Sequence, residues 1–290
     1  MNRLEEVRTA IADNTVPGGS AFGRAAAEVI MLTLQEQRSL DDPAAGALLA
    51  ETTDWLVATK PSMTSVRTVA SLALDAWESG GVDGVSAAMG EFIADSERAI
   101  TTIADHAAAF IKPGSRVLFH SYSGSLIHIL RRAAETTPDL TYLFTESRPY
   151  RESRRVVAAL AELPVAFVNY SDAAVAVAAS KADLAIVGVD ALFEDGSFAN
   201  KTGTLPLALA CQYVGIPLYA VTEMSKLYRG DPDDVSMEQR PPVEMHEGWE
   251  MAVSGRVEVT NQFFEMTPAS LVTAYLTDKG VLTPAEVSGA

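Results

Sequence analysis

The chain has 290 residues, of which 48% are hydrophobic and 21% are charged, so it is long enough for one or two domains with a substantial core. Its 38 acidic and 22 basic residues give a formal net charge of −16, which argues against binding to nucleic acid or to an anionic membrane surface. The single cysteine, Cys211, excludes an internal disulfide framework and a cysteine-based zinc site. Because Cys211 lies in an apolar helical stretch, we expect a buried thiol rather than a reactive nucleophile.

The sequence carries no signal for a membrane segment. No apolar run approaches the roughly 18 residues that a membrane span needs. The segment Met1–Glu6 lacks the apolar stretch of a secretory signal. We therefore expect a cytoplasmic protein that makes no contact with membranes.

The first 112 residues predict a series of helices. Apolar residues recur at helical spacing over residues 25–37, 64–77 and 84–110. Pro43 suits the first turn of a further helix, and Gly80 and Gly81 separate two of the others. We expect a helical N-terminal domain over residues 1–112.

From residue 113 to residue 290, short β-rich runs alternate with helical stretches. We expect strands over residues 117–119, 140–144, 165–168, 184–189 and 218–221. Apolar strands joined by crossover helices are typical of a doubly wound parallel sheet. The predicted fold class is therefore α/β, a helical N-terminal domain followed by a Rossmann-like, mostly parallel sheet domain. We also expect an acidic loop or lid over residues 230–248, a further strand over 257–259 and a final helix over 268–276.

The fourth predicted strand ends in a carboxylate, Asp190, and Asn200 and Lys201 precede the next helix. Open α/β sheets bind ligands at the carboxyl ends of their strands, so these residues predict a site for an anionic ligand. Burial at the end of so apolar a strand should raise the pKa of Asp190 and suit it to proton transfer. Asp190 could instead hold the N–H groups of a loop, and Lys201 could be a solvated surface lysine.

The first predicted strand delivers His120, Ser121, Ser123 and Gly124, which could cradle a phosphate with backbone N–H groups. The same loop could equally be a strand-to-helix turn capped by serines. It matches neither a dinucleotide fingerprint, nor a P-loop, nor a nucleophile elbow. His120 could orient this loop or simply be packed, and the histidine spacings predict no metal site.

Two further basic residues follow predicted strands. Arg148, after the second strand, offers a bidentate fork for a phosphate, or a surface salt bridge with Glu146 or Glu152. Lys226 follows the fifth strand. Both are candidate ligand-binding residues at the same sheet edge.

The residues of these strand ends, taken in order, match a known family. The chain resembles the superfamily that unites the alpha, beta and delta regulatory subunits of eukaryotic translation initiation factor 2B with two isomerases. Those isomerases act on ribose 1,5-bisphosphate and on 5-methylthioribose 1-phosphate. The resemblance covers nearly the whole chain and rests on segments 145–149, 188–190, 200–204, 222–226 and 261–268, together with the His120 loop.

The resemblance implies roles for individual positions. Asp190 matches the aspartate that, with a cysteine, is thought to move a proton between C1 and C2 of the sugar. Ser121 stands where the isomerases carry that cysteine, and a hydroxyl is a far weaker acid than a thiol. Pro17-Gly18-Gly19 stands at their Arg-Gly-Ala phosphate motif, and the nearby Arg24 is the candidate substitute for the missing arginine.

Three hypotheses follow. The first is an initiation factor 2B-like regulatory protein that binds a phosphorylated sugar or nucleoside monophosphate and has a translation-factor partner. The second is an aldose–ketose isomerase that converts ribose 1,5-bisphosphate to ribulose 1,5-bisphosphate, with Asp190 as acid/base and Ser121 or His120 as its partner. The third is a vestigial pocket that serves only in assembly. None implies a cofactor. The resemblance implies a homodimer or a higher even oligomer, and the segment Phe263–Phe264 is a candidate interface.

Overall fold

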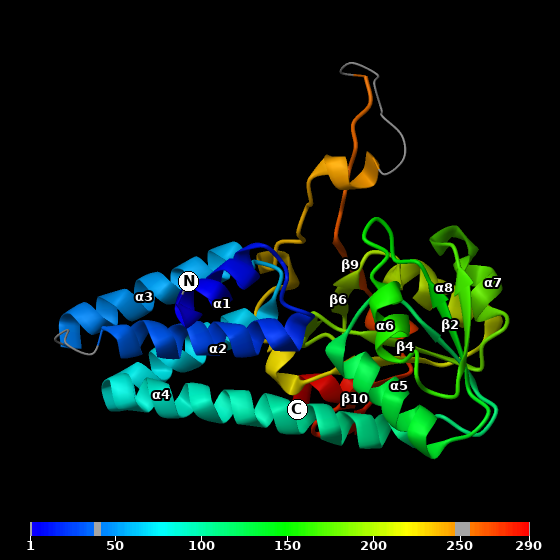
Figure 1. Cartoon of the computed structure of the whole chain (residues 1–290), viewed down its shortest axis with the longest axis horizontal. Helices are drawn as coiled ribbons and strands as arrows, with labels where there is room; N and C mark the ends of the chain where they lie inside the picture. The colour runs from blue at the N-terminus through cyan, green and yellow to red at the C-terminus, as the bar shows by residue number, and fades with distance from the viewer. Residues whose placement is uncertain (1, 38–41, 247–255, 290) are drawn as a thin grey trace.

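The computed structural model describes residues 2–37, 42–246 and 256–289. Its N-terminal part is a layer of helices beside a sheet domain (Figure 1). The helices of this layer are α1 (Arg3–Ala12), α2 (Gly19–Glu36), α3 (Asp42–Thr59) and α4 (Thr64–Ala108). Their apolar faces form one core around fully buried side chains such as Ile30, Leu56 and Met89.

The long helix α4 belongs to both parts of the molecule (Figure 1). Its first half contributes Val66 and Met89 to the helical core, and its second half contributes Ile103 and Ala107 to the core beneath the main sheet. The sequence predicts two helices here. The structure joins them across a kink at Gly81, whose φ of 55° and ψ of −145° are non-helical and tolerated by glycine.

The main sheet has seven strands in the order β11-β10-β7-β4-β1-β2-β3. All neighbours are parallel except β11, which is antiparallel to β10. The strands are β1 (Arg116–Phe119), β2 (Thr141–Thr145), β3 (Ala166–Tyr170), β4 (Leu184–Gly188), β7 (Leu218–Thr222), β10 (Ala274–Thr277) and β11 (Gly280–Leu282). The five parallel strands that the sequence predicts are confirmed, as is the doubly wound class.

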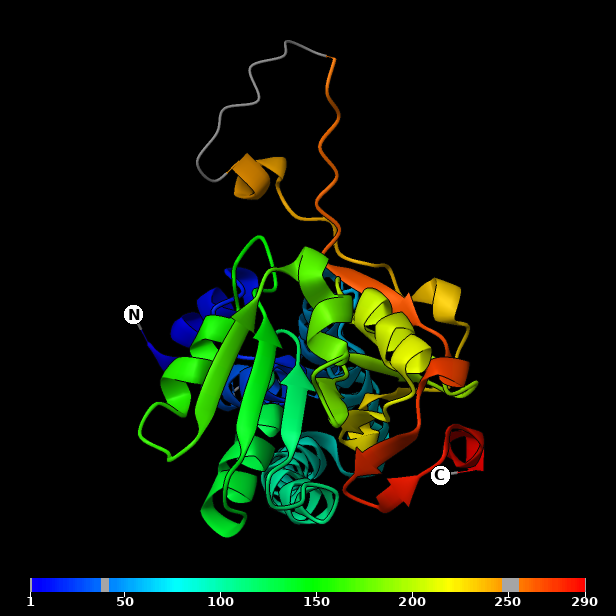
Figure 2. The same ribbon diagram turned by 90° about the vertical axis from the view of Figure 1, so that its right-hand side faces the viewer.

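Helices cover both faces of this sheet (Figures 1 and 2). On one face α4, α5 (Gly124–Thr136) and α6 (Ser153–Ala159) pack against Val117 and Phe119. On the other, α7 (Val175–Ala179) and α8 (Thr204–Val214) pack against Leu118. Successive strand residues therefore enter opposite cores, which explains why the strands are apolar throughout. No helix of the described residues is long and apolar enough to cross a bilayer.

A second, four-stranded sheet was not predicted from the sequence. Its order is β8-β5-β6-β9, built from β5 (Ala191–Phe193), β6 (Phe198–Lys201), β8 (Leu227–Tyr228) and β9 (Phe264–Thr267). Strands of two to four residues leave too short a pattern to read in a sequence. The consequence for the site is that Asn200 and Lys201 lie in a strand of a hairpin, not in a loop.

Two expectations for the C-terminal region are wrong. Residues 257–259 form no strand, and residues 268–276 form a short 3₁₀ turn, Ala269–Leu271, followed by β10 instead of a helix. The β-branched and aromatic residues Thr273, Tyr275 and Thr277 favour the extended chain, and β10 is buried beside β7. Of the expected acidic loop, residues 230–246 run through 3₁₀ turns, whereas residues 247–248 lie outside the described residues.

The shared helix α4 leads to a prediction on stability. Ile103→Ala should lower the free energy of unfolding by about 2–5 kcal/mol, because the lost side chain is fully buried under the sheet. Leu74→Ala, on the same helix but 41% exposed, should cost far less. Urea unfolding followed by circular dichroism would compare the two variants. Equal losses would contradict a role for the C-terminal half of α4 in the sheet core.

Candidate functional site

The site lies at the carboxyl edge of the main sheet, where β1 and β4 lie side by side and the chain leaves them in opposite directions. Doubly wound folds bind ligands at this switch point. A cavity of about 70 Å³ lies here, and three of the predicted residues, Ser121, Asp190 and Lys201, line it. Its lining also includes Glu152, Arg155, Glu238 and Phe263.

Asp190 follows β4, and its backbone N–H donates to the carbonyl of Ala199 at 2.9 Å. Its carboxylate lies against Gly19 of the helical domain, where a Cβ would come within 2.8 Å of Oδ1. Burial raises the pKa of Asp190 from 3.8 to about 6, although the charge of Lys226 opposes this rise. The raised pKa expected from the sequence is thus confirmed, and Gly19 is needed for the close approach.

Lys226 lies behind Asp190 instead of in the cavity lining. The residue is 3% exposed, and its ammonium donates to the carbonyl of Val189 at 2.7 Å. Burial lowers the pKa of Lys226, and the charges of Glu223 and Asp190 oppose that fall. Thr64 of α4 donates to the backbone carbonyl of Lys226 at 2.7 Å, so both domains hold this lysine in place.

Lys201 ends β6 with its ammonium enclosed beside the cavity. The residue is 2% exposed, and Nζ lies 3.2 Å from Oε2 of Glu152 and 3.3 Å from the ring centre of Phe263. Among the described residues Nζ nevertheless has no partner in hydrogen-bonding geometry. Burial lowers its pKa, and Glu152 opposes the fall. Lys201 is therefore a desolvated cation with unused donors.

Ser121 is held at a φ of 67°, in the left-handed region. Its hydroxyl donates to Oε2 of Glu152 at 3.0 Å, and its backbone N–H donates to Oγ of Ser153 at 3.1 Å. The same carboxylate oxygen of Glu152 therefore accepts the hydrogen bond of Ser121 and forms an ion pair with Lys201. The Ser121 proton points to Glu152 in this arrangement.

His120 is 2% exposed and lies outside the cavity lining. Its Nε2 donates to the carbonyl of Thr202 at 2.9 Å, which leaves Nδ1 to accept from the hydroxyl of Thr145 at 2.5 Å. Burial lowers the pKa of His120, so the neutral ring is favoured. A Cβ on Gly203, whose φ is 112°, would lie 2.5 Å from the ring. Of the two roles left open by the sequence, orientation of the strand-end loops fits these contacts.

Ser123, Gly124 and Asn200 shape the surroundings. Ser123 caps α5 by accepting from the N–H of Leu126, and the amide of Asn200 donates to Oγ1 of Thr204 at 2.9 Å. The loop at Gly18 covers the start of α5, where a Cβ would lie 3.5 Å from the N atom of Gly124. In the described structure these three residues are not part of the cavity lining.

The arginine of the cavity is not the one that the sequence indicated. The backbone N–H of Arg148 donates to Asp172 at 2.8 Å, and Arg148 does not line the cavity, whereas Arg155 lines it and lies over the ring of Tyr122. Arg24, considered for the missing phosphate arginine, turns to Oγ of Ser96 at 2.8 Å. The spacing of Glu152 and Arg155, three residues apart at the start of α6, was the signal available in the sequence.

Phe264 and Phe263 have intramolecular roles. Phe264 is 3% exposed in the core of the helical domain, and Phe263 covers Lys201. The expectation that this segment is an exposed interface is therefore wrong for Phe264. Cys211 is buried, and burial raises the pKa of its thiol to about 12, which confirms the expected structural role.

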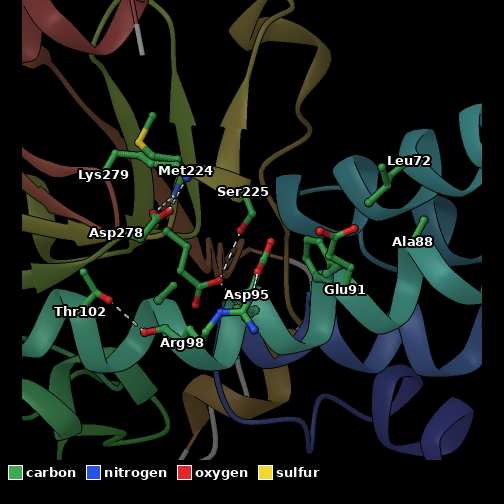
Figure 3. Close-up of a pocket in the computed structure, with 14 residues that line it drawn as sticks. Leu72, Ala88, Glu91, Asp95, Arg98, Thr102, Met224, Ser225, Asp278 and Lys279 are labelled. Atoms are coloured by element: carbon green, nitrogen blue, oxygen red, sulfur yellow. Dashed lines mark hydrogen bonds and ion pairs between the residues drawn. The ribbon is translucent and has the colours of Figure 1, made fainter.

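A larger cavity, of about 670 Å³, lies between α4 and the loops that follow β7 and β10 (Figure 3). Acidic residues on its wall include Glu91, Asp95 and Asp278, and none of the predicted site residues lines it. Within the described ranges, no three His, Cys, Asp or Glu side chains are grouped as a metal site requires.

The comparisons with known proteins identify the family of the chain. The model of the initiation factor 2 subunit family matches residues 15–284. The chain belongs to the initiation factor 2 subunit family.

Within this family, the chain is 28% identical to the methylthioribose-1-phosphate isomerase of Albidiferax ferrireducens, over 96% of this chain and 84% of the relative. It is 25% identical to the ribose 1,5-bisphosphate isomerase of Methanocaldococcus jannaschii, over 98% and 92%. The crystal structure of translation initiation factor eIF-2B from Pyrococcus horikoshii OT3 matches with a TM-score of 0.84 and 26% identity over 98% of both chains.

The raised pKa of Asp190 predicts a pH-dependent stability for this family member. A carboxyl group whose pKa rises on folding stabilises the fold while protonated, and that stability is lost as pH rises from about 4 to 6. The unmodified protein should therefore lose about 2–3 kcal/mol of unfolding free energy over this interval. Asp190→Asn should not lose it, because the asparagine side chain stays neutral. Urea unfolding of both proteins at pH 4 and pH 7 would measure it. A difference between them that does not change with pH would contradict the raised pKa.

Proposed function

We propose that the protein binds a phosphorylated sugar or a nucleoside monophosphate at the carboxyl edge of its main sheet, as a regulatory, initiation factor 2B-like member of its family. The observation that carries the proposal is that Lys201 is buried while its ammonium keeps unused hydrogen-bond donors. The residue is 2% exposed and lines the cavity, and its ammonium lacks a partner in hydrogen-bonding geometry among the described residues. Charge-assisted hydrogen bonds from such a group to a phosphate are strong because water competes little there.

The rest of the cavity supports a ligand with both phosphate and hydroxyl groups. Arg155 adds a second cation to the lining, and Asp190 can accept hydrogen bonds from sugar hydroxyls. We also propose Arg148, Asn200 and Lys226 as ligand-binding residues, although none of them lines the cavity in the ligand-free structure. A volume of about 70 Å³ holds a few waters but no sugar phosphate, so binding requires that Glu152 or Phe263 move aside.

The surroundings of Ser121 favour binding over turnover. An aldose–ketose isomerase needs two placed groups that hand a proton from C2 to C1. Asp190, with a pKa of about 6, suits one of these roles. Ser121 donates its proton to Glu152, and both nitrogens of His120 are engaged with Thr202 and Thr145. Because a hydroxyl is a far weaker acid than a thiol, Ser121 remains a poor proton-transfer partner for Asp190 even when a ligand displaces Glu152.

The isomerase remains the second candidate, because two of the similar proteins carry that activity in their names and because Asp190 keeps an appropriate pKa. It would convert ribose 1,5-bisphosphate to ribulose 1,5-bisphosphate. We further propose a cytoplasmic protein that forms a homodimer or a higher even oligomer and contacts a translation factor.

Ligand binding is the direct test of the proposed function. Ribose 5-phosphate, ribose 1,5-bisphosphate or adenosine monophosphate should raise the melting temperature by the amount that mass action dictates. Lys201→Met should weaken binding by about 10-fold to 100-fold, since it removes a charged donor worth about 1.5–3 kcal/mol. Lys181→Met, at an exposed position, is the matched control and should bind as the unmodified protein does. If none of the three ligands shifts the melting temperature, the proposal fails.

An activity assay separates the two candidates. Purified protein incubated with ribose 1,5-bisphosphate should yield no ribulose 1,5-bisphosphate, because the Ser121 hydroxyl is too weak an acid and both nitrogens of His120 are engaged. The product would be followed by chromatography against an enzyme-free control. Turnover that disappears in Asp190→Asn, while ligand binding persists, would establish the isomerase instead.

A further inference from the structure

We propose that Glu152 is a built-in anion that occupies the phosphate position of the cavity until a ligand displaces it. This inference rests on the proposed function, because it assigns the phosphate position to Lys201. It makes Glu152 the residue that decides which anions bind.

Oε2 of Glu152 gathers the donors that a phosphate oxygen would use. Lys201 Nζ lies 3.2 Å away, the hydroxyl of Ser121 donates at 3.0 Å, and the hydroxyl of Ser147 donates at 3.5 Å. These donors come from β6, from the loop after β1 and from the loop after β2, so they converge from three elements. A convergent set of one cation and two hydroxyls is a typical oxyanion site.

Glu152 is less buried than the lysine with which it pairs. Its side chain is 20% exposed, whereas that of Lys201 is 3% exposed. Glu152 stands just before the first residue of α6, where the chain has come from the loop that carries Arg148. A side chain at a helix end with partial exposure can turn toward solvent at small cost, whereas Lys201 is held between Phe263 and the sheet.

Two anions cannot share this position. A phosphate oxygen bound to Lys201 would lie within a few ångströms of Glu152, and like charges so close strongly disfavour each other. Ligand binding therefore requires that Glu152 leave. A phosphate dianion with three acceptor oxygens can replace its contacts, and a single carboxylate only matches them. The cavity should accordingly select phosphate esters over sugar acids.

The position of Glu152 also explains how the buried charge of Lys201 is tolerated when no ligand is bound. Lys201 would otherwise be a buried cation with no counter-ion, which is costly. Glu152 neutralises it and fills the space, so that only about 70 Å³ stays open. The ligand-free protein thus contains a substitute for the phosphate.

The test is anion rescue of Glu152→Gln, which keeps the shape and removes the charge. The variant should melt roughly 3–8 °C lower, because Lys201 loses its counter-ion. Inorganic phosphate should restore at least half of that loss, at ionic strength matched with chloride, and should bind about tenfold tighter than to the unmodified protein. Glu162→Gln is the matched control, because Glu162 pairs with Arg131 at the surface and is 72% exposed.

The double variant Glu152→Gln, Lys201→Met should show no rescue, since the cation that attracts phosphate is gone. Failure of phosphate to rescue the single variant, or equal rescue of the double variant, would overturn the inference. The proposed function is judged separately, by sugar-phosphate and nucleotide binding to the unmodified protein. Rescue by phosphate without sugar-phosphate or nucleotide binding would support the inference and refute the proposed function. Such binding without rescue would support the proposed function and refute the inference.

Discussion

The loss of water around charged groups at the carboxyl edge of the main sheet is the constraint on which the site depends. Burial raises the pKa of Asp190 and lowers the pKa values of Lys201 and Lys226, so each group is displaced toward its neutral form. Each charge is tolerated because an opposite charge lies near it: Lys226 beside Asp190, and Glu152 beside Lys201. The same scarcity of water makes each of these charges a strong contact for a ligand.

The helical domain creates this dry environment. The carboxylate of Asp190 lies against Gly19 at the start of α2, and Ser65 of α4 donates to the carbonyl of Gly19 at 2.8 Å. Asn14 and Glu238, 3.5 Å apart, join the helical layer to the segment that leads to Phe263. Because α4 is packed into both cores, the helical layer cannot leave without disturbing the sheet. The site is therefore a property of the two parts together, not of the sheet edge alone.

The sequence predicts the main sheet well because its strands are buried on both faces and read as unbroken apolar runs. Asp190 could be located for the same reason, as the carboxylate that ends the most apolar of them. The second sheet is not predicted, since strands such as β5 and β8 are too short to carry a pattern. The spacing over residues 268–276 predicts a helix where the structure has β10. Arg155 and Glu152 were missed as cavity residues because their place depends on how the loop after β2 folds back, which is set by tertiary contacts such as that of Arg148 with Asp172.

The arrangement around Asp190 separates what favours binding from what favours turnover. Desolvation alone supplies an acid with a pKa near 6, and a binding site for hydroxyls and phosphate profits from it as much as an enzyme does. Turnover needs in addition a second group whose proton is free to move. The Ser121 proton points to Glu152, and His120 is fixed between Thr202 and Thr145. In the ligand-free structure one oxygen of Glu152 both neutralises Lys201 and accepts the hydrogen bond of Ser121, so a movement of this side chain would change the charge of the cavity and the environment of Ser121 together.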